Sequence, residues 1–135
     1  MDWRLEAVVV PVTDIDRAKQ FYEQVGFHLD VDHRAGETFR VVQLTPVGSA
    51  CSIILLQHFG TPGALQGLHL IVRDIDAARA ELVARGVDVS DVFHFEDGAP
   101  AAGPGPSRSD YDSFLSFSDP DGNGWMIQEV PSRPS

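Results

Sequence analysis

The stretch VVVPVTDIDRAKQFYEQVGF, residues 8–27, carries the clearest structural pattern in the chain. An apolar run ends at Val12, the triplet Asp-Ile-Asp begins at Asp14, and apolar residues then recur at helical spacing as far as Gly26. Acidic residues suit the first turn of a helix, and a glycine can adopt the left-handed conformation that ends one. The stretch therefore predicts a strand, a helix and a second strand.

The same pattern returns 60 residues later as LHLIVRDIDAARAELVARGV, residues 68–87. After each helix we expect a strand, over 27–34 in the first copy and 87–95 in the second. Each copy thus begins with a strand, a helix and another strand.

The later strands repeat as well, at a larger offset. LTPVGSACSIIL, residues 44–55, aligns with SDPDGNGWMIQE, residues 118–129, at an offset of 74. This alignment pairs Arg40 with Phe114 and Val41 with Leu115. The 14 extra residues of the second copy fall in the Pro- and Gly-rich segment 96–110, which is predicted to be a loop.

The chain is therefore expected to be an α+β protein made of two βαβββ modules. The predicted boundaries are a first module over 1–58, a linker over 59–65, a second module over 66–130 with the insertion 96–110, and a tail over 131–135. The insertion is either a tolerated surface loop or a lid over a site, since long loops in compact domains are often functional.

Composition narrows the classes of partner. The chain has 135 residues, one cysteine and a formal net charge of −10. Nucleic acid is not an expected partner, because phosphate binding needs a basic surface. No apolar run reaches the length of a membrane span, and the charged residues near the N-terminus do not match a signal peptide, so we expect no membrane partner and a cytoplasmic location.

Together, VPVTDIDRAKQFYEQVGF, LHLIVRDIDAARAELVARG and FSDPDGNGWMIQEV (residues 10–27, 68–86 and 117–130) resemble the vicinal oxygen chelate superfamily. That superfamily includes the glyoxalase I enzymes, extradiol dioxygenases and bleomycin-resistance proteins. The resemblance implies eight strands in a cup-shaped pair of mixed sheets with the helices outside, a site inside the cup, and a homodimer.

Metal-binding members of the superfamily use four ligand positions related by the internal repeat. The resemblance places them at Ala7, Ser52, Gly67 and Met126. None of these is a competent ligand for a divalent ion, so we expect no metal and no cofactor. A shift of one residue in the first strands would bring Glu6 and Gln66 to these positions instead.

His69 lies two residues beyond Gly67 and is expected on the same strand face, as a general base, a polar anchor for a ligand, or a hydrogen-bonded structural histidine. The same alternation adds Val9, Ile54 and Gln128 to the ligand-binding candidates. The facing of the third strands is undecided from the sequence, so Arg40 and Tyr111 are further candidates.

These features favour a metal-free small-molecule binding protein of the bleomycin-resistance type, with an apolar cup for a hydrophobic or cationic ligand. One alternative is a metal-independent lyase, isomerase or cyclase acting on an aromatic or polyketide-like compound, with His69 as base. A third is a metal-dependent glyoxalase-type lyase or dioxygenase whose ligands lie elsewhere.

Overall fold

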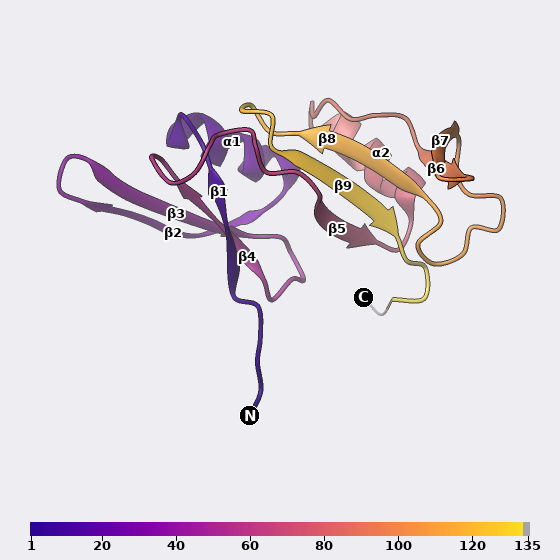
Figure 1. Cartoon of the computed structure of the whole chain (residues 1–135), viewed down its shortest axis with the longest axis horizontal. Coiled ribbons are helices and arrows are strands. Elements are labelled where there is room, and N and C mark those ends of the chain that lie inside the picture. Colours follow the sequence, from indigo (N-terminus) through magenta and orange to yellow (C-terminus); the bar gives the residue numbers. More distant parts are fainter. Residues whose placement is uncertain (134–135) are drawn as a thin grey trace. The chain divides into compact units, whose positions relative to one another are not determined.

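A computed structural model describes residues 1–133 as two compact units (Figure 1). Unit 1 comprises residues 1–65 and 119–123, and unit 2 comprises residues 66–118 and the chain from Gly124 onward. Residues 134–135 of the expected tail lie outside the described residues. No helix of the described chain has the length and apolar character needed to cross a membrane.

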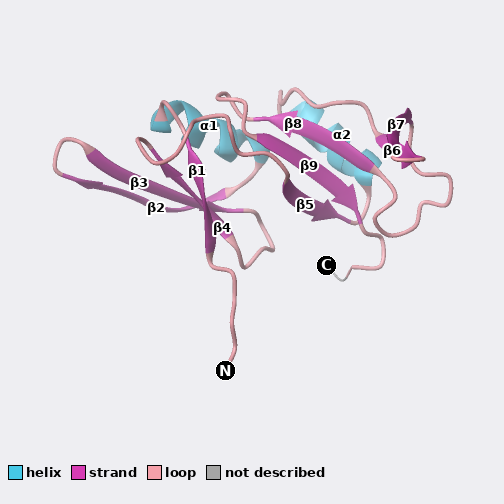
Figure 2. Ribbon diagram, in the orientation of Figure 1, coloured by secondary structure: helices cyan, strands magenta, loops and turns pink. Residues whose placement is uncertain are grey.

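Unit 1 is a four-stranded sheet with one helix (Figure 2). Its elements are β1 (Ala7–Pro11), α1 (Ile15–Val25), β2 (His28–Ala35), β3 (Phe39–Thr45) and β4 (Ser52–Leu56). The strand order is β1-β4-β3-β2, with β1 parallel to β4 and the other neighbours antiparallel. The predicted βαβββ order of the first module is therefore confirmed.

Unit 2 repeats this plan with one strand more. Its elements are β5 (Leu68–Val72), α2 (Ile75–Ala84), β6 (Phe93–Glu96), β7 (Ala99–Ala102), β8 (Phe114–Ser118) and β9 (Gly124–Glu129), in the order β5-β9-β8-β6-β7. The described chain thus has nine strands rather than the expected eight, because the start of the insertion pairs with β6 as the hairpin strand β7. The strand predicted over 87–95 forms only from Phe93 onward.

Both helices begin and pack as the sequence predicts. Asp14 caps α1 by accepting a hydrogen bond from the Arg17 amide, and Asp74 caps α2 by accepting from two amides of its first turn. Gly26 ends α1 with a φ of 117°, a conformation that favours glycine. The buried stripe of α1 is formed by Ile15, Ala18, Tyr22 and Val25.

Each sheet has one face under its helix and one face away from it, which we call the open face. Helix α1 packs on β3 and β4, and α2 packs on β8 and β9. Alternation along the strands sorts the side chains, since residues two apart share a face. The helix-side cores contain Val10, Val42, Leu44, Ile53 and Leu55 in unit 1, and Leu115, Phe117, Trp125 and Ile127 in unit 2.

The register corrects the alignment of the third strands. Leu44 pairs with Ile53 in β4, and Leu115 pairs with Ile127 in β9. The two isoleucines are 74 residues apart but the two leucines are 71 apart. The turns between the third and fourth strands therefore differ in length, and Arg40 corresponds to Tyr111 instead of Phe114.

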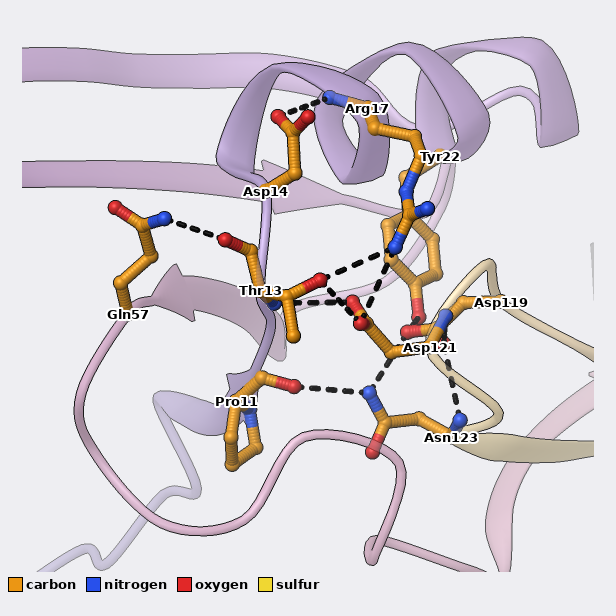
Figure 3. A network of polar contacts seen from close by, with 9 residues as sticks. All are labelled: Pro11, Thr13, Asp14, Arg17, Tyr22, Gln57, Asp119, Asp121 and Asn123. Carbon is orange, nitrogen blue, oxygen red and sulfur yellow. Dashed lines mark hydrogen bonds and ion pairs between the residues drawn. The ribbon is translucent and has the colours of Figure 1, made fainter.

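The turn between β8 and β9 belongs to unit 1, where it docks on α1 (Figure 3). The buried Asp119 carboxylate accepts four hydrogen bonds: from the amides of Asp121 and Asn123 at 3.0 and 2.9 Å, from the Asn123 side chain at 2.9 Å, and from the Tyr22 hydroxyl at 2.8 Å. Asp121 in turn accepts from the Thr13 hydroxyl at 2.6 Å. The turn is thus fixed by side chains from α1 and from the chain just before it.

The rest of the insertion is anchored within unit 2. Arg108 donates two hydrogen bonds to Glu129, at 3.1 and 2.8 Å, and also pairs with Asp76 in the first turn of α2. Glu129 is 1% exposed and accepts from the Ile75 amide. The Arg108 guanidinium holds the pKa of this carboxyl below its usual range. These contacts favour a fixed surface loop, which is the first of the two alternatives for the insertion, and not a moving lid.

Replacing Tyr22 by Phe is expected to lower the free energy of unfolding by about 2 kcal/mol, because a buried carboxylate loses one of its charge-assisted donors. Tyr111→Phe is the matched control: Tyr111 is 53% exposed and its hydroxyl accepts only a 3.3 Å contact from Arg133. Urea denaturation of both variants makes the comparison. Equal effects of the two substitutions would contradict the importance given to the Asp119 network.

His94 predicts a pH-dependent stability. Its ring nitrogens lie 2.8 Å from Glu96 Oε1 and 2.8 Å from the Gly103 carbonyl oxygen, and these partners, Glu96 first, raise the pKa of His94 above its usual value. The folded state therefore binds the proton more tightly, so this stabilisation is complete below about pH 6.5 and disappears as pH rises through the folded pKa.

The measurement is the unfolding free energy of the wild type and of His94→Gln between about pH 5 and 9. In His94→Gln, the unfolding free energy is expected to lose the fall with rising pH that His94 contributes. His33→Gln, at an exposed strand position, is expected to keep that fall. Parallel pH curves for the wild type and His94→Gln would refute the assignment.

Candidate functional site

The open face of unit 2 combines a hollow with an apolar wall. The register places His69 beside Met126, and Met126 beside Ser116. The next row places Ile71 beside Gln128, and Gln128 beside Phe114. The sequence-based prediction that His69 shares a face with Met126 and Gln128 therefore agrees with the strand pairing.

The hollow has a volume of about 270 Å³. It is lined by Gln66, Gly67, Ser116, Phe117, Ser118, Gly124, Trp125 and Met126. Gly67 and Gly124 have no side chains to fill it, and a Cβ built on Gly124 would lie 2.0 Å from Gln66 Oε1. The small residues thus create the space, and the Gln66 amide forms part of its wall.

Three phenylalanines form an aromatic cluster on the same open face. The ring centroids of Phe93 and Phe114 are 5.8 Å apart in a stacked arrangement, and Phe95 meets both rings edge-on at 5.6 and 5.2 Å. Phe114 is buried, whereas Phe95 is 45% exposed. Exposed aromatic surface on a sheet face that also carries a hollow is typical of a small-molecule site.

The open face of unit 1 holds the corresponding candidates of the first module. Ala7 pairs with Ser52, and Val9 pairs with Ile54, which in turn pairs with Gln43. A second hollow of about 240 Å³ lies at one end of this unit. Its lining is mostly apolar: Val9, Pro11, Phe59, Gly60, Thr61, Ala64 and Leu65.

The predicted site residues are thus brought together in two groups. Ala7, Val9, Ser52 and Ile54 share the open face of unit 1, and Gly67, His69, Met126 and Gln128 share that of unit 2. His69 is exposed, and its Nδ1 lies 2.7 Å from the Gly67 carbonyl oxygen. That contact requires a proton on Nδ1, so Nε2 is the acceptor nitrogen of the neutral ring.

Arg40 and Tyr111 are not part of either group. Arg40 lies on the helix side of β3, where it donates to Asp32 at 2.9 and 2.8 Å and pairs with Asp16 at 2.6 Å. These carboxylates raise its pKa, and Arg40 lowers the pKa of Asp32. Tyr111 directly follows the insertion and has a φ of 64°. Both placements favour structural roles.

The aromatic cluster was not among the predicted site residues, although the sequence contains a signal for it. Phe93 and Phe95 alternate in the segment FHFE, which is the pattern of two side chains on one strand face. The wrong offset for the third strands placed Phe114 opposite Arg40 and hid its partnership with them.

The four positions that the superfamily uses for metal do not fit a divalent ion here. Ala7 and Gly67 supply no donor atom, and a lone Ser52 hydroxyl and Met126 thioether are poor ligands. Gly67 has a φ of 82°, so a histidine or glutamate there would be strained. Within residues 1–133, no group of three or more His, Cys, Asp or Glu side chains is arranged to hold a metal.

Two solved structures of known proteins are similar to this chain over nearly its whole length. TnmS3, an antibiotic binding protein from Streptomyces sp. CB03234, is 35% identical, with a TM-score of 0.74 over 96% of this chain and 97% of that one. A glyoxalase/bleomycin resistance protein from the same Streptomyces is 36% identical, with a TM-score of 0.70 over 93% and 100% of the two chains.

A relative in Bacillus subtilis (strain 168), the uncharacterized protein YetH, is 27% identical over 130 residues, which cover 93% of this chain and 98% of YetH. Residues 4–127 match the profile of one family, and that stretch includes both repeats and the turn between β8 and β9. The chain therefore belongs to the Glyoxalase/Bleomycin resistance protein/Dioxygenase superfamily.

Proposed function

We propose that this protein binds a small hydrophobic molecule with a flat aromatic part, without a metal, and holds it unchanged. The observation that carries the proposal is the aromatic cluster of Phe93, Phe95 and Phe114, on the same open face as the 270 Å³ hollow. A flat ring can stack on the exposed face of Phe95.

The comparisons support the binding of a small molecule. TnmS3 is an antibiotic binding protein, and this chain shares 35% identity with it over nearly its whole length. The absence of donor atoms at Ala7 and Gly67 supports binding that needs no metal. The homodimer and the cytoplasmic location expected from the sequence remain predictions.

The second candidate, a metal-independent enzyme, is favoured by one observation. His69 is exposed on the open face with Nδ1 held by the Gly67 carbonyl, so its Nε2 could take a proton from a bound compound. Mass spectrometry of a compound recovered after incubation separates the two functions. An unchanged compound supports sequestration, and a product supports the enzyme.

Phe95→Ala is expected to weaken binding of 9-anthracenemethanol roughly tenfold, because it removes the exposed wall of the aromatic cluster. Phe39→Ala is the matched control, since Phe39 is 51% exposed but belongs to unit 1. Fluorescence anisotropy of the anthracene measures both affinities. The saturated 1-adamantanemethanol should be insensitive to Phe95→Ala. Equal losses in the two variants, or no binding of the anthracene, would reject the proposal.

The metal-free part of the proposal predicts that Zn²⁺, Ni²⁺, Mn²⁺ and Fe²⁺ leave the melting temperature unchanged. A metal that binds only the folded state would stabilise it by about 2.7 kcal/mol at one hundred times its dissociation constant. Elemental analysis of protein purified without chelators accompanies the melting curves. One bound metal per chain, lost on substituting Glu6 or Gln66, would instead support the register shifted by one residue.

A further inference from the structure

A β-bulge in β2 turns one carboxylate onto the open face of unit 1. The pairing of β2 with β3 shifts between Leu29, opposite Leu44, and Val31, opposite Gln43. In a regular strand Asp30 and Asp32 would share a face, because side chains alternate with a period of two. The bulge separates them: Asp32 joins Arg40 on the helix side, and Asp30 joins Thr45 on the open face. Bulges often re-aim a side chain at a functional site.

Asp30 is held there by a chain of hydroxyl groups. The Thr45 hydroxyl donates to an Asp30 carboxylate oxygen. Because Thr45 has only one hydroxyl proton, Ser52 must be the donor in the 2.6 Å contact between Ser52 Oγ and Thr45 Oγ1. Ser52 is only 5% exposed, so the series of hydroxyl groups is buried at the end away from Asp30. Each hydroxyl therefore donates towards the carboxylate: Ser52 donates to Thr45, and Thr45 donates to Asp30.

The carboxylate itself has no strong cationic partner. Its neighbour Asp32 is paired with Arg40 and Lys19, but in residues 1–133 no Lys or Arg lies within ion-pair distance of Asp30. The one basic group recorded near it is His28, whose Nε2 lies 3.8 Å from Asp30 Oδ1. The Asp30 side chain is 33% exposed, so part of the carboxyl group is accessible to a ligand.

A row of three aliphatic residues and one glutamine runs beside this polar one. Val31 pairs with Gln43, Gln43 pairs with Ile54, and Ile54 pairs with Val9. Val31 is 42% exposed, so its side chain is accessible on this face. A fixed carboxylate bordering an exposed aliphatic surface is complementary to a molecule with a charged nitrogen and an apolar body.

We propose that the open face of unit 1 binds a protonated aliphatic amine through Asp30, with the apolar part of the same molecule over Val31 and Ile54. Thr45 and Ser52 are positioning residues that hold the carboxylate in place. This site goes beyond the proposed function, because it uses neither the aromatic cluster nor the hollow of unit 2 and selects its ligand by charge.

Two probes of equal shape test the charge. These are 1-adamantanemethylamine and 1-adamantanemethanol, which lack aromatic rings and so do not report on Phe95. Both are titrated into the ¹⁵N-labelled protein, and NMR shifts of the Asp30, Val31 and Thr45 amides give the affinities. The amine is expected to bind about tenfold more tightly than the alcohol, the size of one charge-assisted hydrogen bond.

Asp30→Asn is expected to abolish the difference in affinity between the amine and the alcohol. The amide removes the charge but keeps the shape of the side chain and still accepts a hydrogen bond from Thr45. Glu37→Gln removes a charge from the exposed turn between β2 and β3, so it controls for the overall attraction of a chain with net charge −10 and should keep the preference. Thr45→Val should weaken amine binding about threefold, and Thr45→Ser should restore it.

Equal affinities for the two probes, shifts confined to unit 2, or no shifts up to the solubility limit would each overturn the amine site. A preference lost equally in Asp30→Asn and Glu37→Gln would also overturn it, because general electrostatic attraction would then explain the data. The proposed aromatic function is judged separately, by the anthracene probe and Phe95→Ala.

Discussion

The Asp119 carboxylate is the group on which unit 1 most depends. It is 5% exposed, and both of its oxygens are fully used: one accepts two amides of its own turn, and the other accepts the Tyr22 hydroxyl and the Asn123 side chain. Charge is costly to bury unless hydrogen bonds compensate for the lost water. The turn must therefore keep one shape, and α1 must present Tyr22 to it.

The consequences of this constraint reach the strands on both sides of the turn. Asn123 also donates to the Pro11 carbonyl at the end of β1, so the turn reaches the first strand as well as the helix. The last residue pair before the turn is Ser118 with Gly124, and both of these residues line the hollow of unit 2. The residues that shape that hollow thus follow directly, along the chain, from a turn whose geometry is fixed by a buried charge.

Much of the fold was predictable because it is written in local periodicity. The Asp-Ile-Asp triplets correctly predicted that the helices begin after Asp14 and Asp74. The alternation along β5 and β9 correctly placed His69 on the same face as Met126. Register was harder, because it depends on the length of turns whose ends carry no periodic signal. That is why the third strands were aligned by 74 residues instead of 71, and why the role of Phe114 was missed.

The chemistry of unit 1 was hidden for a related reason. Ser52 was singled out as a position that lacks a metal ligand, but its partners Thr45 and Asp30 come from two other strands. A bulge adds one residue without any compositional mark, so strict alternation places Asp30 on the same face as Asp32. Only the pairing of β2 with β3 shows that the two carboxylates point to opposite sides.

The bulge at Asp30 also bears on how such chains diverge. Removing this one codon would restore regular pairing and delete the carboxylate, while Val42, Leu44 and the other residues beneath α1 would keep their places. Inserting one would do the reverse. A one-residue change in the length of an edge strand could therefore switch a relative between charged and neutral ligands. A sequence comparison that scores only residue replacements would miss such a change.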